Sequence, residues 1–155
     1  MTKKDIEDLA LELLSKPSSA YLATIDENGF PHIRAIFNLR CSEKFPHPAE
    51  VIEEYEENPL TVYISTNTSS VKIKQIKENN NIAIYYSLPS EVKGIMLQGQ
   101  AEILDDIELK EKIWVDDWVM YYPKGYTDPD FTMLRLKPKF LKGWYKGPHE
   151  LYLDD

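Results

Sequence analysis

The stretch Tyr21–Phe37 reads YLATIDENGFPHIRAIF and predicts an antiparallel β-hairpin. Two runs rich in apolar residues flank DENG, in which Asn28-Gly29 is a strong signal for a tight turn. Because side chains alternate between the two faces of a strand, one face of the second run carries Ile33, Ala35 and Phe37. Arg34 lies on the opposite face with His32 and Ile36. The hairpin is therefore largely apolar but contains a charged residue in its second strand.

A helix is expected before this hairpin. Thr2 and Asp5 have the spacing of an N-terminal cap, and Pro17 ends the helical pattern. The apolar residues between them recur at helical spacing and form one stripe: Ile6, Leu9, Ala10, Leu13 and Leu14. The pattern predicts an amphipathic helix.

After the hairpin, short strands and helices follow one another. An acidic insert, 41–58, is expected to contain a helix over Ala49–Glu57, because Pro48 suits a first helical turn. The other expected elements are a strand at 60–65, a helix from Ser69 or Ser70 to about Asn79, a hairpin of 81–88 and 94–104, a helix over Ile107–Tyr121, closing strands at 131–136 and 139–147, and an acidic tail at 148–155. Long βαβ repetition is missing, so we expect one domain over 1–155, mainly β within the α+β class, built on an antiparallel sheet or barrel with peripheral helices.

The composition narrows the function classes. A net charge of −8 opposes a nucleic-acid partner and a polybasic membrane anchor. The single cysteine, Cys41, cannot form an internal disulfide and suits a reducing compartment. The N-terminal stretch lacks the apolar core of a signal peptide, and no apolar run reaches membrane-spanning length. We therefore expect a cytoplasmic protein.

The stretch Ile64–Lys72, ISTNTSSVK, concentrates hydroxyl and amide side chains between a strand and a helix. Such residues satisfy free backbone N–H groups at a helix start, which is ordinary capping. They also suit an anion, because a helix N-terminus with hydroxyls and a nearby lysine is a good phosphate receptor. From Ser65 to Lys77 there are lysines but no acid, although the whole chain is acidic. Both interpretations remain open on the residues alone.

Arg34 also has two interpretations. It interrupts the apolar run IRAIF, either as an edge-strand arginine in solvent or as a planar donor for a phosphate or a polar ring edge. The sequence shows no motif for other kinds of site. His32, His47 and His149 do not have the spacing of metal ligands, and paired catalytic carboxylates, a dinucleotide fingerprint and a P-loop are all missing. No catalytic residue is predicted.

Four stretches, taken in order, resemble the FMN-binding split-barrel family related to pyridoxamine 5′-phosphate oxidase, and in particular its general stress protein 26-like branch. They are YLATIDENGFPHIRAIF, VYISTNTSSVKI, LQGQAEILDD and DPDFTMLRLKPKFLKGWYKG, and the likeness spans roughly residues 6 to 147. The resemblance implies a six-stranded antiparallel split barrel and a homodimer with two flavins at the subunit interface.

The same resemblance implies the cofactor contacts. Thr66, Ser70 and Lys72 would bind the FMN phosphate, and Arg34 would be followed by two residues that run along the flavin. The full set implied as cofactor-binding is Arg34, Ala35, Ile36, Ser65, Thr66, Asn67, Ser70, Val71, Lys72 and Trp144.

This sequence departs from the family pattern at three places. Val71 stands where a second basic residue is common, and Ala35 stands where proline is usual. The C-terminal Arg-x-His motif of pyridoxal-phosphate-producing members is replaced by HELYLDD. The insert 41–58 is longer than usual and could cover the flavin or the dimer interface, although a plain surface helix is the favoured interpretation.

The implied function is an FMN-dependent oxidoreductase with a small-molecule substrate other than pyridoxamine phosphate. A second hypothesis keeps the fold but makes the chain a non-catalytic flavin- or haem-binding stress or sensor protein, with deazaflavin as a further alternative cofactor. A third hypothesis is an interaction domain whose loop binds nothing. It leaves the acid-free lysine segment unexplained.

Overall fold

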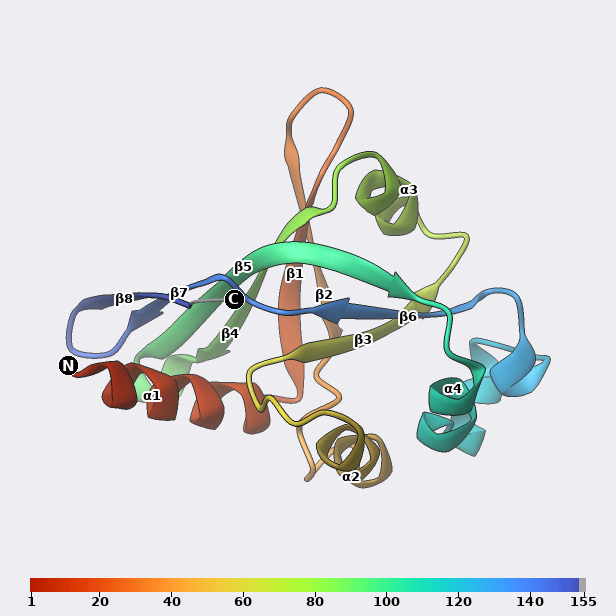
Figure 1. Cartoon of the computed structure of the whole chain (residues 1–155), viewed down its shortest axis with the longest axis horizontal. Coiled ribbons are helices and arrows are strands. Elements are labelled where there is room, and N and C mark those ends of the chain that lie inside the picture. Colours follow the sequence, from red (N-terminus) through yellow and green to blue (C-terminus); the bar gives the residue numbers. More distant parts are fainter. Residues whose placement is uncertain (154–155) are drawn as a thin grey trace.

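The computed structural model describes residues 1–153, and its frame is one antiparallel sheet curled into a half-barrel (Figure 1). The strands are β1 (Ser19–Ile25), β2 (Pro31–Phe37), β3 (Val62–Asn67), β4 (Asn81–Leu88), β5 (Lys93–Leu104), β6 (Phe131–Leu136), β7 (Phe140–Trp144) and β8 (Pro148–Tyr152). Six of them follow one another in the order β2-β1-β4-β5-β6-β3, while β7 pairs with β5 and with β8. The predicted six-stranded split barrel is confirmed, with a further pair of strands added beside β5.

The predicted hairpin forms β1 and β2. Gly29 has a φ of +83°, a backbone conformation that glycine adopts without strain, and the register pairs Leu22 with Arg34. β1 turns alternate side chains into the core, whereas β2 is an edge strand with little buried surface. The apolar face of β2 is exposed: Ile33 is 69% and Phe37 42% accessible.

The long strand β5 curls the sheet. Its first part pairs with β4 on one side and β7 on the other, and its last residues, from Ala101 to Leu104, pair with β6 instead. Gly99 lies at this change of partner, where an added Cβ would press on the Leu136 side chain and the Lys137 carbonyl. The two ends of the strand path, β2 and β3, thereby come near each other without being paired.

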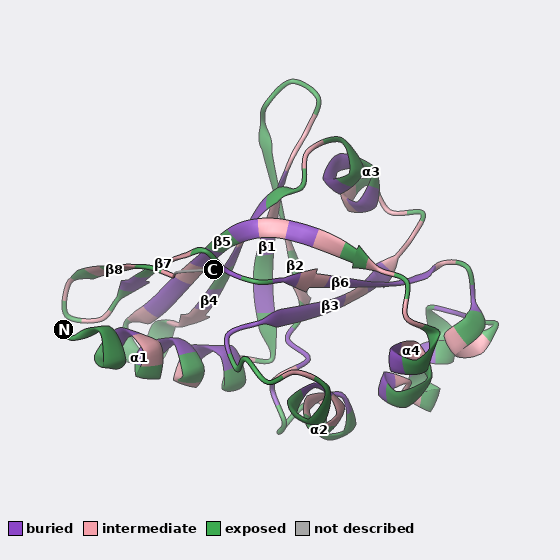
Figure 2. Cartoon of the chain, in the orientation of Figure 1, coloured by how far each residue is buried: buried purple, intermediate pink, exposed green. Residues whose placement is uncertain are grey.

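The first helix, α1 (Lys3–Ser15), begins and ends as expected. Thr2 and Asp5 form a capping box, with the Asp5 N–H donating to Thr2 Oγ1 at 3.1 Å and the Thr2 N–H donating to Asp5 Oδ2 at 2.9 Å. The predicted apolar stripe is buried and joins the main core inside the half-barrel, and Figure 2 shows purple, buried segments along α1 and the strands. Helix α3 (Val71–Glu78) adds Ile73 and Ile76 to that core.

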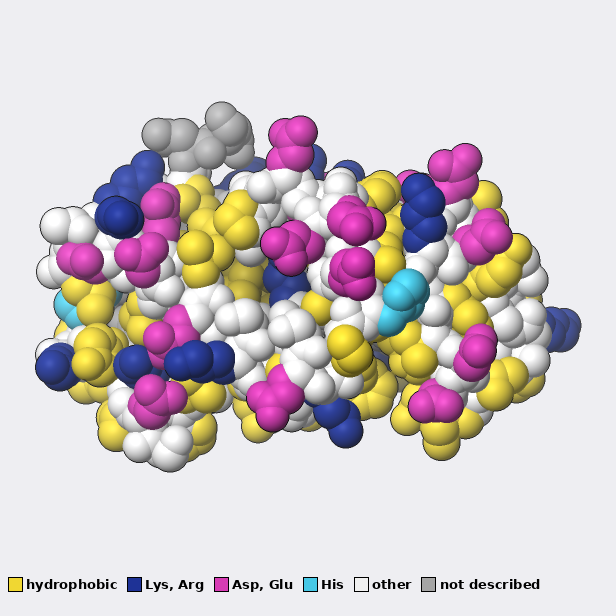
Figure 3. All heavy atoms as spheres, turned by 90° about the horizontal axis from the view of Figure 1, so that it is seen from below, with side chains coloured by type: hydrophobic (Ala, Val, Ile, Leu, Met, Phe, Trp, Pro, Cys, Tyr) yellow, Lys and Arg dark blue, Asp and Glu magenta, His cyan; other side chains and the backbone are white. Residues whose placement is uncertain are grey.

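A second core lies between the barrel and two helices, α2 (Pro46–Tyr55) and α4 (Ile107–Ile113). Ile52 of α2 is fully buried in this core, to which Tyr63 and Phe131 also belong. The helix predicted over Ala49–Glu57 therefore begins earlier, because Pro46 already occupies the first helical turn, and it also ends earlier. The insert thus forms an outer helix, and the inner side of this helix is part of the second core. In the view from below, carboxylates lie among apolar side chains over much of the surface (Figure 3).

The prediction of one helix over Ile107–Tyr121 is wrong for the second half of that range. α4 ends at Ile113 because Trp114 takes an extended backbone, with ψ of 136°, and a short 3₁₀-helix follows at Asp116–Met120. This break lets both Trp114 and Trp118 pack their rings on Phe131, at centroid distances of 5.6 and 6.0 Å. Two more 3₁₀ turns occur at Pro89–Glu91 and Gly125–Thr127.

The segment predicted as an acidic tail, 148–155, contains the strand β8, which pairs with β7. Lys146 and Gly147 take positive φ values of 56° and 140° in the turn between these strands. Residues 154 and 155 of that segment lie outside the described residues. Within residues 1–153, no helix is long and apolar enough to cross a membrane.

Candidate functional site

A cavity of about 280 Å³ lies at the split, where the edge strands β2 and β3 come near each other. β2 and β3 each contribute three consecutive residues, and α3 contributes a lysine. The lining residues are Ser19, Ala35, Ile36, Phe37, Ser65, Thr66, Asn67, Lys72, Trp118, Tyr121 and Tyr122. The structure thus brings together six of the ten residues that the sequence marked for cofactor binding.

Lys72 reaches the polar wall of this cavity from the first turn of α3. Its Nζ donates to Thr66 Oγ1 at 2.8 Å and to Ser70 Oγ at 3.2 Å. Both partners are neutral hydroxyl groups. Burial lowers the pKa of the Lys72 ammonium, and the nearby charge of Arg34 lowers it further.

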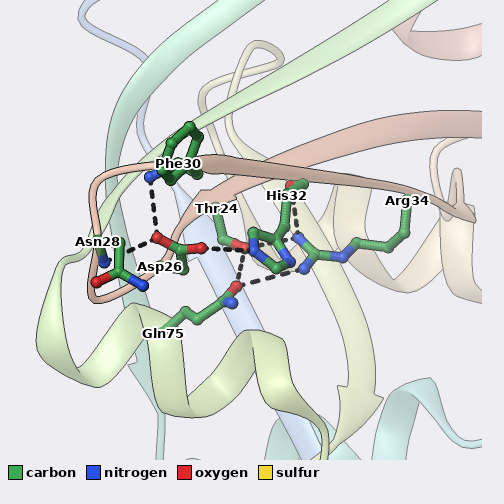
Figure 4. Close-up of polar contacts among 7 residues, drawn as sticks. All are labelled: Thr24, Asp26, Asn28, Phe30, His32, Arg34 and Gln75. Atoms are coloured by element: carbon green, nitrogen blue, oxygen red, sulfur yellow. Dashed lines mark hydrogen bonds and ion pairs between the residues drawn. The ribbon is translucent and has the colours of Figure 1, made fainter.

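Arg34 lies behind this wall, with its side chain turned from β2 toward β1 and α3 (Figure 4). Its Nη1 donates to Thr24 Oγ1 at 2.7 Å, to the His32 carbonyl at 3.1 Å and to the Leu22 carbonyl at 3.3 Å. Its Nη2 donates to Gln75 Oε1 at 3.4 Å. Burial lowers the pKa of this guanidinium as well. Arg34 is thus no edge-strand arginine lying free in solvent.

These two cations share an unusual electrostatic situation. Within residues 1–153, neither Arg34 nor Lys72 forms an ion pair with a carboxylate. They are half-buried and close enough to each other for the pKa of one to respond to the other. Half-buried charges of like sign cost free energy unless an opposite charge compensates them. The arrangement can therefore hold an anion.

The hydrogen bonds at the start of α3 show whether the hydroxyl groups of the preceding loop cap the helix. Ser70 occupies the N-cap position, but its side chain makes no capping hydrogen bond, and the first turn contains no acid. The Ser70 and Thr66 hydroxyls instead accept hydrogen bonds from Lys72. Ordinary side-chain capping, one of the two interpretations left open above, is wrong for Ser70.

Asp130 fixes the loop before α3 from the start of β6. Its Oδ2 accepts from Asn67 Nδ2 at 2.6 Å, and its Oδ1 accepts from the Ser69 N–H at 2.8 Å. The Asn67 amide is the main cause that lowers the pKa of Asp130. Thr68 adds a hydroxyl bond to the Pro129 carbonyl at 2.9 Å. Sequence reasoning missed Asp130, because no local pattern links it to residues so far away along the chain.

Aromatic side chains form another part of the cavity lining, the aromatic wall. Phe37, Trp118, Tyr121 and Tyr122 all line the cavity, and Phe45 of the insert packs on Phe37 at a centroid distance of 5.2 Å. Sequence reasoning assigned none of them to the site. The abundance of aromatic residues was visible, but the 3₁₀ turn that carries Trp118 was hidden inside a predicted helix. The cavity can accept a flat ring beside an anionic group.

The remaining predicted residues lie apart from the cavity lining. Val71 is exposed on α3, next to Lys72. Trp144 is 49% exposed on β7, beside Tyr85, Met96 and Pro148 around a different depression. Its assignment to the cofactor stays a prediction, and it requires residues from a second copy of the chain to meet in one site.

The other reactive residue types stand away from the site. The histidine rings are held by Asp26, by the Lys112 carbonyl and by the Tyr145 carbonyl, and none of them lines the cavity. Cys41 is buried, consistent with a structural residue. In the described part of the chain, no cluster of His, Cys, Asp or Glu could hold a metal ion.

Comparison with known proteins gives one family match and close structural neighbours. A family model described as pyridoxamine 5′-phosphate oxidase matches residues 6–145. General stress protein 26 of Bacillus subtilis is 26% identical over 145 residues, which cover 92% of this chain and 90% of that protein.

Two solved structures extend the comparison. A Clostridium acetobutylicum protein related to general stress protein 26 is 28% identical and superposes with a TM-score of 0.76, over 99% of this chain and 97% of that one. A heme binding protein from Mycobacterium smegmatis is 14% identical, with a TM-score of 0.69 over 98% of this chain and 60% of that one. The second likeness concerns the fold alone.

Proposed function

The chain belongs to the pyridoxamine 5′-phosphate oxidase family, and from that premise we propose that it binds FMN in the split cavity and acts as an FMN-dependent oxidoreductase. The observation that carries the proposal is the pair of half-buried cations, Arg34 and Lys72, which lack a carboxylate partner within residues 1–153. A phosphate group would supply the missing negative charge.

The residues present fit such a cofactor. Lys72 would donate to the phosphate, together with the Thr66 and Ser70 hydroxyls that now accept from it. The start of α3 adds backbone N–H groups and the positive end of the helix dipole. The Arg34 charge would stabilise the same anion from behind. When bound, FMN supplies the redox chemistry itself.

The rest of the cavity suits the flavin ring. The backbone of β2 from Ala35 to Phe37 borders the cavity and offers N–H and C=O groups along one edge. The exposed side chains of Phe37 and Tyr121 offer apolar faces on which a flat ring would pack. Such packing would exclude water from one side of the ring and leave its other side to a substrate.

We propose that the substrate is not pyridoxamine phosphate. The segment after β7 reads HELYLDD and lacks the Arg-x-His motif that the family uses for that substrate. Over Pro148–Tyr152 this segment is the strand β8, paired with β7. A second phosphorylated ligand would need a second set of cations, and Lys72 is the lone cation among the residues that line the cavity, within residues 1–153.

A homodimer would complete the site. Exposed apolar side chains occur along the outer face of the sheet on β2, β1, β4 and β7, with β5 lying between β4 and β7. They are Tyr21, Ile33, Phe37, Tyr85 and Trp144. Contiguous apolar surface of this kind marks an interaction site, and Phe37 links it directly to the cavity. A second copy seated on this face would bring another Trp144 toward the flavin.

The cofactor proposal is tested by an absorption spectrum of purified protein, repeated after FMN is added and unbound FMN is removed. We expect an equimolar flavin spectrum that survives desalting, followed by NADH oxidation when an electron acceptor is present. Binding without any turnover would favour the non-catalytic flavin hypothesis. A colourless protein after both steps would contradict the proposal, and deazaflavin and haem would be titrated next.

Haem is the weaker alternative for this cavity. Haem proteins commonly hold the iron through a histidine, and the residues that line the cavity include none. A change in the haem absorption band on titration would reverse this ranking.

The dimer proposal is tested by light scattering on the Ile33→Asp variant. A charge in the middle of the apolar face should convert the dimer to a monomer and weaken FMN retention. Leu11→Asp, at an exposed position on α1, is the matched control and should remain dimeric. A wild-type protein that is monomeric with FMN bound would refute this arrangement.

A further inference from the structure

Within residues 1–153, the hydrogen-bond partners of Arg34 are all electrically neutral. Its guanidinium donates to two backbone carbonyls, to the hydroxyl of Thr24 and to the side-chain amide of Gln75. Thr24 in turn donates its hydroxyl hydrogen to the same Gln75 oxygen. Thr24 is fully buried and Gln75 is 6% exposed. The hydrogen bonds therefore orient the Arg34 guanidinium, but they do not neutralise its charge.

Asp26, an acid at the tip of the same hairpin, is engaged elsewhere. Its carboxylate accepts from the His32 ring at 2.8 Å and from the backbone N–H groups of Asn28 and Phe30 at 2.9 Å each. These bonds lower the pKa of Asp26, with the Phe30 N–H as the main cause. Figure 4 shows the resulting division: Asp26 bonds within the hairpin tip and to His32, while the Arg34 guanidinium reaches Thr24 and Gln75.

Gln75 occupies a place from which a carboxylate could contact Arg34. Its side-chain oxygen accepts from Arg34 Nη2 at 3.4 Å and also from Thr24. A glutamate has the same length and shape as a glutamine, and its oxygen would accept both bonds. A glutamate would remain ionised beside Arg34 and would form a buried ion pair with its guanidinium, in which both carboxylate oxygens could accept hydrogen bonds. The local geometry thus permits a built-in counter-ion, but the chain carries an amide.

We infer that Gln75 is a specificity-determining residue that keeps the cation pair of Arg34 and Lys72 uncompensated for an external phosphate. Its neutral amide positions the guanidinium without supplying negative charge. Gln75 does not line the cavity, so it acts through Arg34 and is a positioning residue. The inference rests on the proposed function in one respect, namely that the phosphate belongs to FMN.

The test compares Gln75→Glu with Gln75→Met, which is neutral and of similar length. Affinities for FMN and for riboflavin, which lacks the phosphate, are measured by quenching of flavin fluorescence. We expect Gln75→Glu to weaken FMN binding roughly 30-fold, the size of one charge-assisted contact, with riboflavin binding unchanged. Gln75→Met should weaken FMN binding less than about fivefold, because it removes one long hydrogen bond but adds no charge.

A second measurement reports on the anion site without any flavin. Inorganic phosphate should raise the thermal unfolding midpoint of the wild type and of Gln75→Met, and should have little effect on Gln75→Glu. The ligand-free Gln75→Glu protein should unfold at a higher temperature than the ligand-free wild type, because Arg34 gains a partner. Loss of FMN binding with a lowered midpoint would instead indicate a damaged fold and would overturn the inference.

The outcomes separate the two proposals. If phosphate stabilises the wild type but FMN does not bind, the flavin proposal fails and the role of Gln75 stands. If FMN binds Gln75→Glu as tightly as wild type, the role of Gln75 fails and the flavin proposal stands. If both variants lose FMN affinity equally, charge is irrelevant and the inference is wrong. If neither ligand affects the wild type, both proposals fall.

Discussion

The starts of α1 and α3 are built on opposite principles. At α1, Thr2 and Asp5 satisfy each other's backbone groups in a capping box, so the helix end is complete within the chain. At α3, the N-cap residue Ser70 makes no side-chain cap, and the first turn carries Lys72 instead of an acid. One helix end needs nothing further. The other concentrates positive charge and donors at the edge of a cavity.

The difference teaches how a stable fold and a ligand site can use the same local element. The hydrogen bonds of a capping box stabilise a helix whether or not a ligand is present. An end without a cap is less stable alone, but its N–H groups and dipole remain available to an anion. In this chain the loop before α3 is held by Asp130, which is far away in the sequence and accepts hydrogen bonds from Asn67 and from the Ser69 N–H. The helix start therefore needs no side-chain cap of its own to hold the loop.

The largest effect should come from removing the charge at α3. Lys72→Met keeps the apolar stem but deletes the ammonium, and we expect FMN affinity to fall about 100-fold, or about 3 kcal/mol, as for a charged hydrogen bond lost. Isothermal titration calorimetry measures the change. Lys74→Met, at an exposed position of the same helix, should bind FMN within about twofold of wild type. Equal losses in both variants would mean that the position of the charge is irrelevant.

A smaller effect should follow from giving α3 the kind of cap that α1 has. Ser70→Asp places a carboxylate at the N-cap, where it can pair with Lys72, and should stabilise the ligand-free protein by about 0.5–1 kcal/mol. The same charge repels a phosphate, so FMN affinity should fall about tenfold. Ser70→Asn, which caps without charge, is the control for chemical denaturation and for titration. Tighter FMN binding by Ser70→Asp would contradict an anion site at this helix end.

Breaking the cap of α1 should affect stability alone. Thr2→Ala removes the hydroxyl of the capping box, and we expect a loss of about 1 kcal/mol in the free energy of unfolding. Thr2→Ser keeps the hydroxyl and should lose much less. FMN affinity should be the same in all three proteins, because the helix lies away from the cavity. A drop in FMN affinity for Thr2→Ala would show that the two helix ends are coupled.

The smallest effects should appear as two separate rises of ligand-free stability with pH, one in the acidic range from Asp5 and one in the alkaline range from Lys72. The pKa of Asp5 is lowered by its bonds to Thr2, so the stabilisation from this group is present above the ordinary pKa of aspartate and is lost as pH falls through the lowered value. The pKa of Lys72 is lowered by burial and by Arg34. The unfolded chain then binds more protons between the lowered and the ordinary lysine pKa, and ligand-free stability should rise with pH across that range.

FMN affinity should change in the other direction over the same alkaline range. Deprotonation of Lys72 removes the charge that the phosphate needs, so binding should weaken as pH rises through its pKa. Titrations of FMN from neutral to alkaline pH, repeated with Lys72→Met, check this point. A binding curve whose pH dependence survives the substitution would assign the effect to another group.

Sequence patterns predicted the local features of this molecule well. Asn28-Gly29 indicated the first hairpin, and the Thr2–Asp5 spacing indicated the cap of α1, because both depend on residues close in the chain. The break at Trp114 was not predictable in the same way. Its extended backbone is favourable because two tryptophan rings then pack on Phe131, a contact between distant segments.

The same division holds for the site. Thr66, Ser70 and Lys72 lie within one short stretch, and the structure brings their polar atoms together. Gln75 was passed over because a buried glutamine on a helix carries no signal until β1 and β2 are packed against it. The aromatic wall was missed because the 3₁₀ turn after α4 depends on the second core.

The pairing of β3 has a consequence for how the chain folds. β1 with β2, β4 with β5 and β7 with β8 are hairpins of neighbouring segments, whereas β3 pairs with β6, which lies far along the chain. Contacts between distant segments carry a larger loop-closure entropy and form more slowly than local hairpins. The cavity requires β3 beside the split and Asp130 just before β6. We therefore expect it to be assembled in that late step, and nascent or partly folded chains should have no place for a ligand.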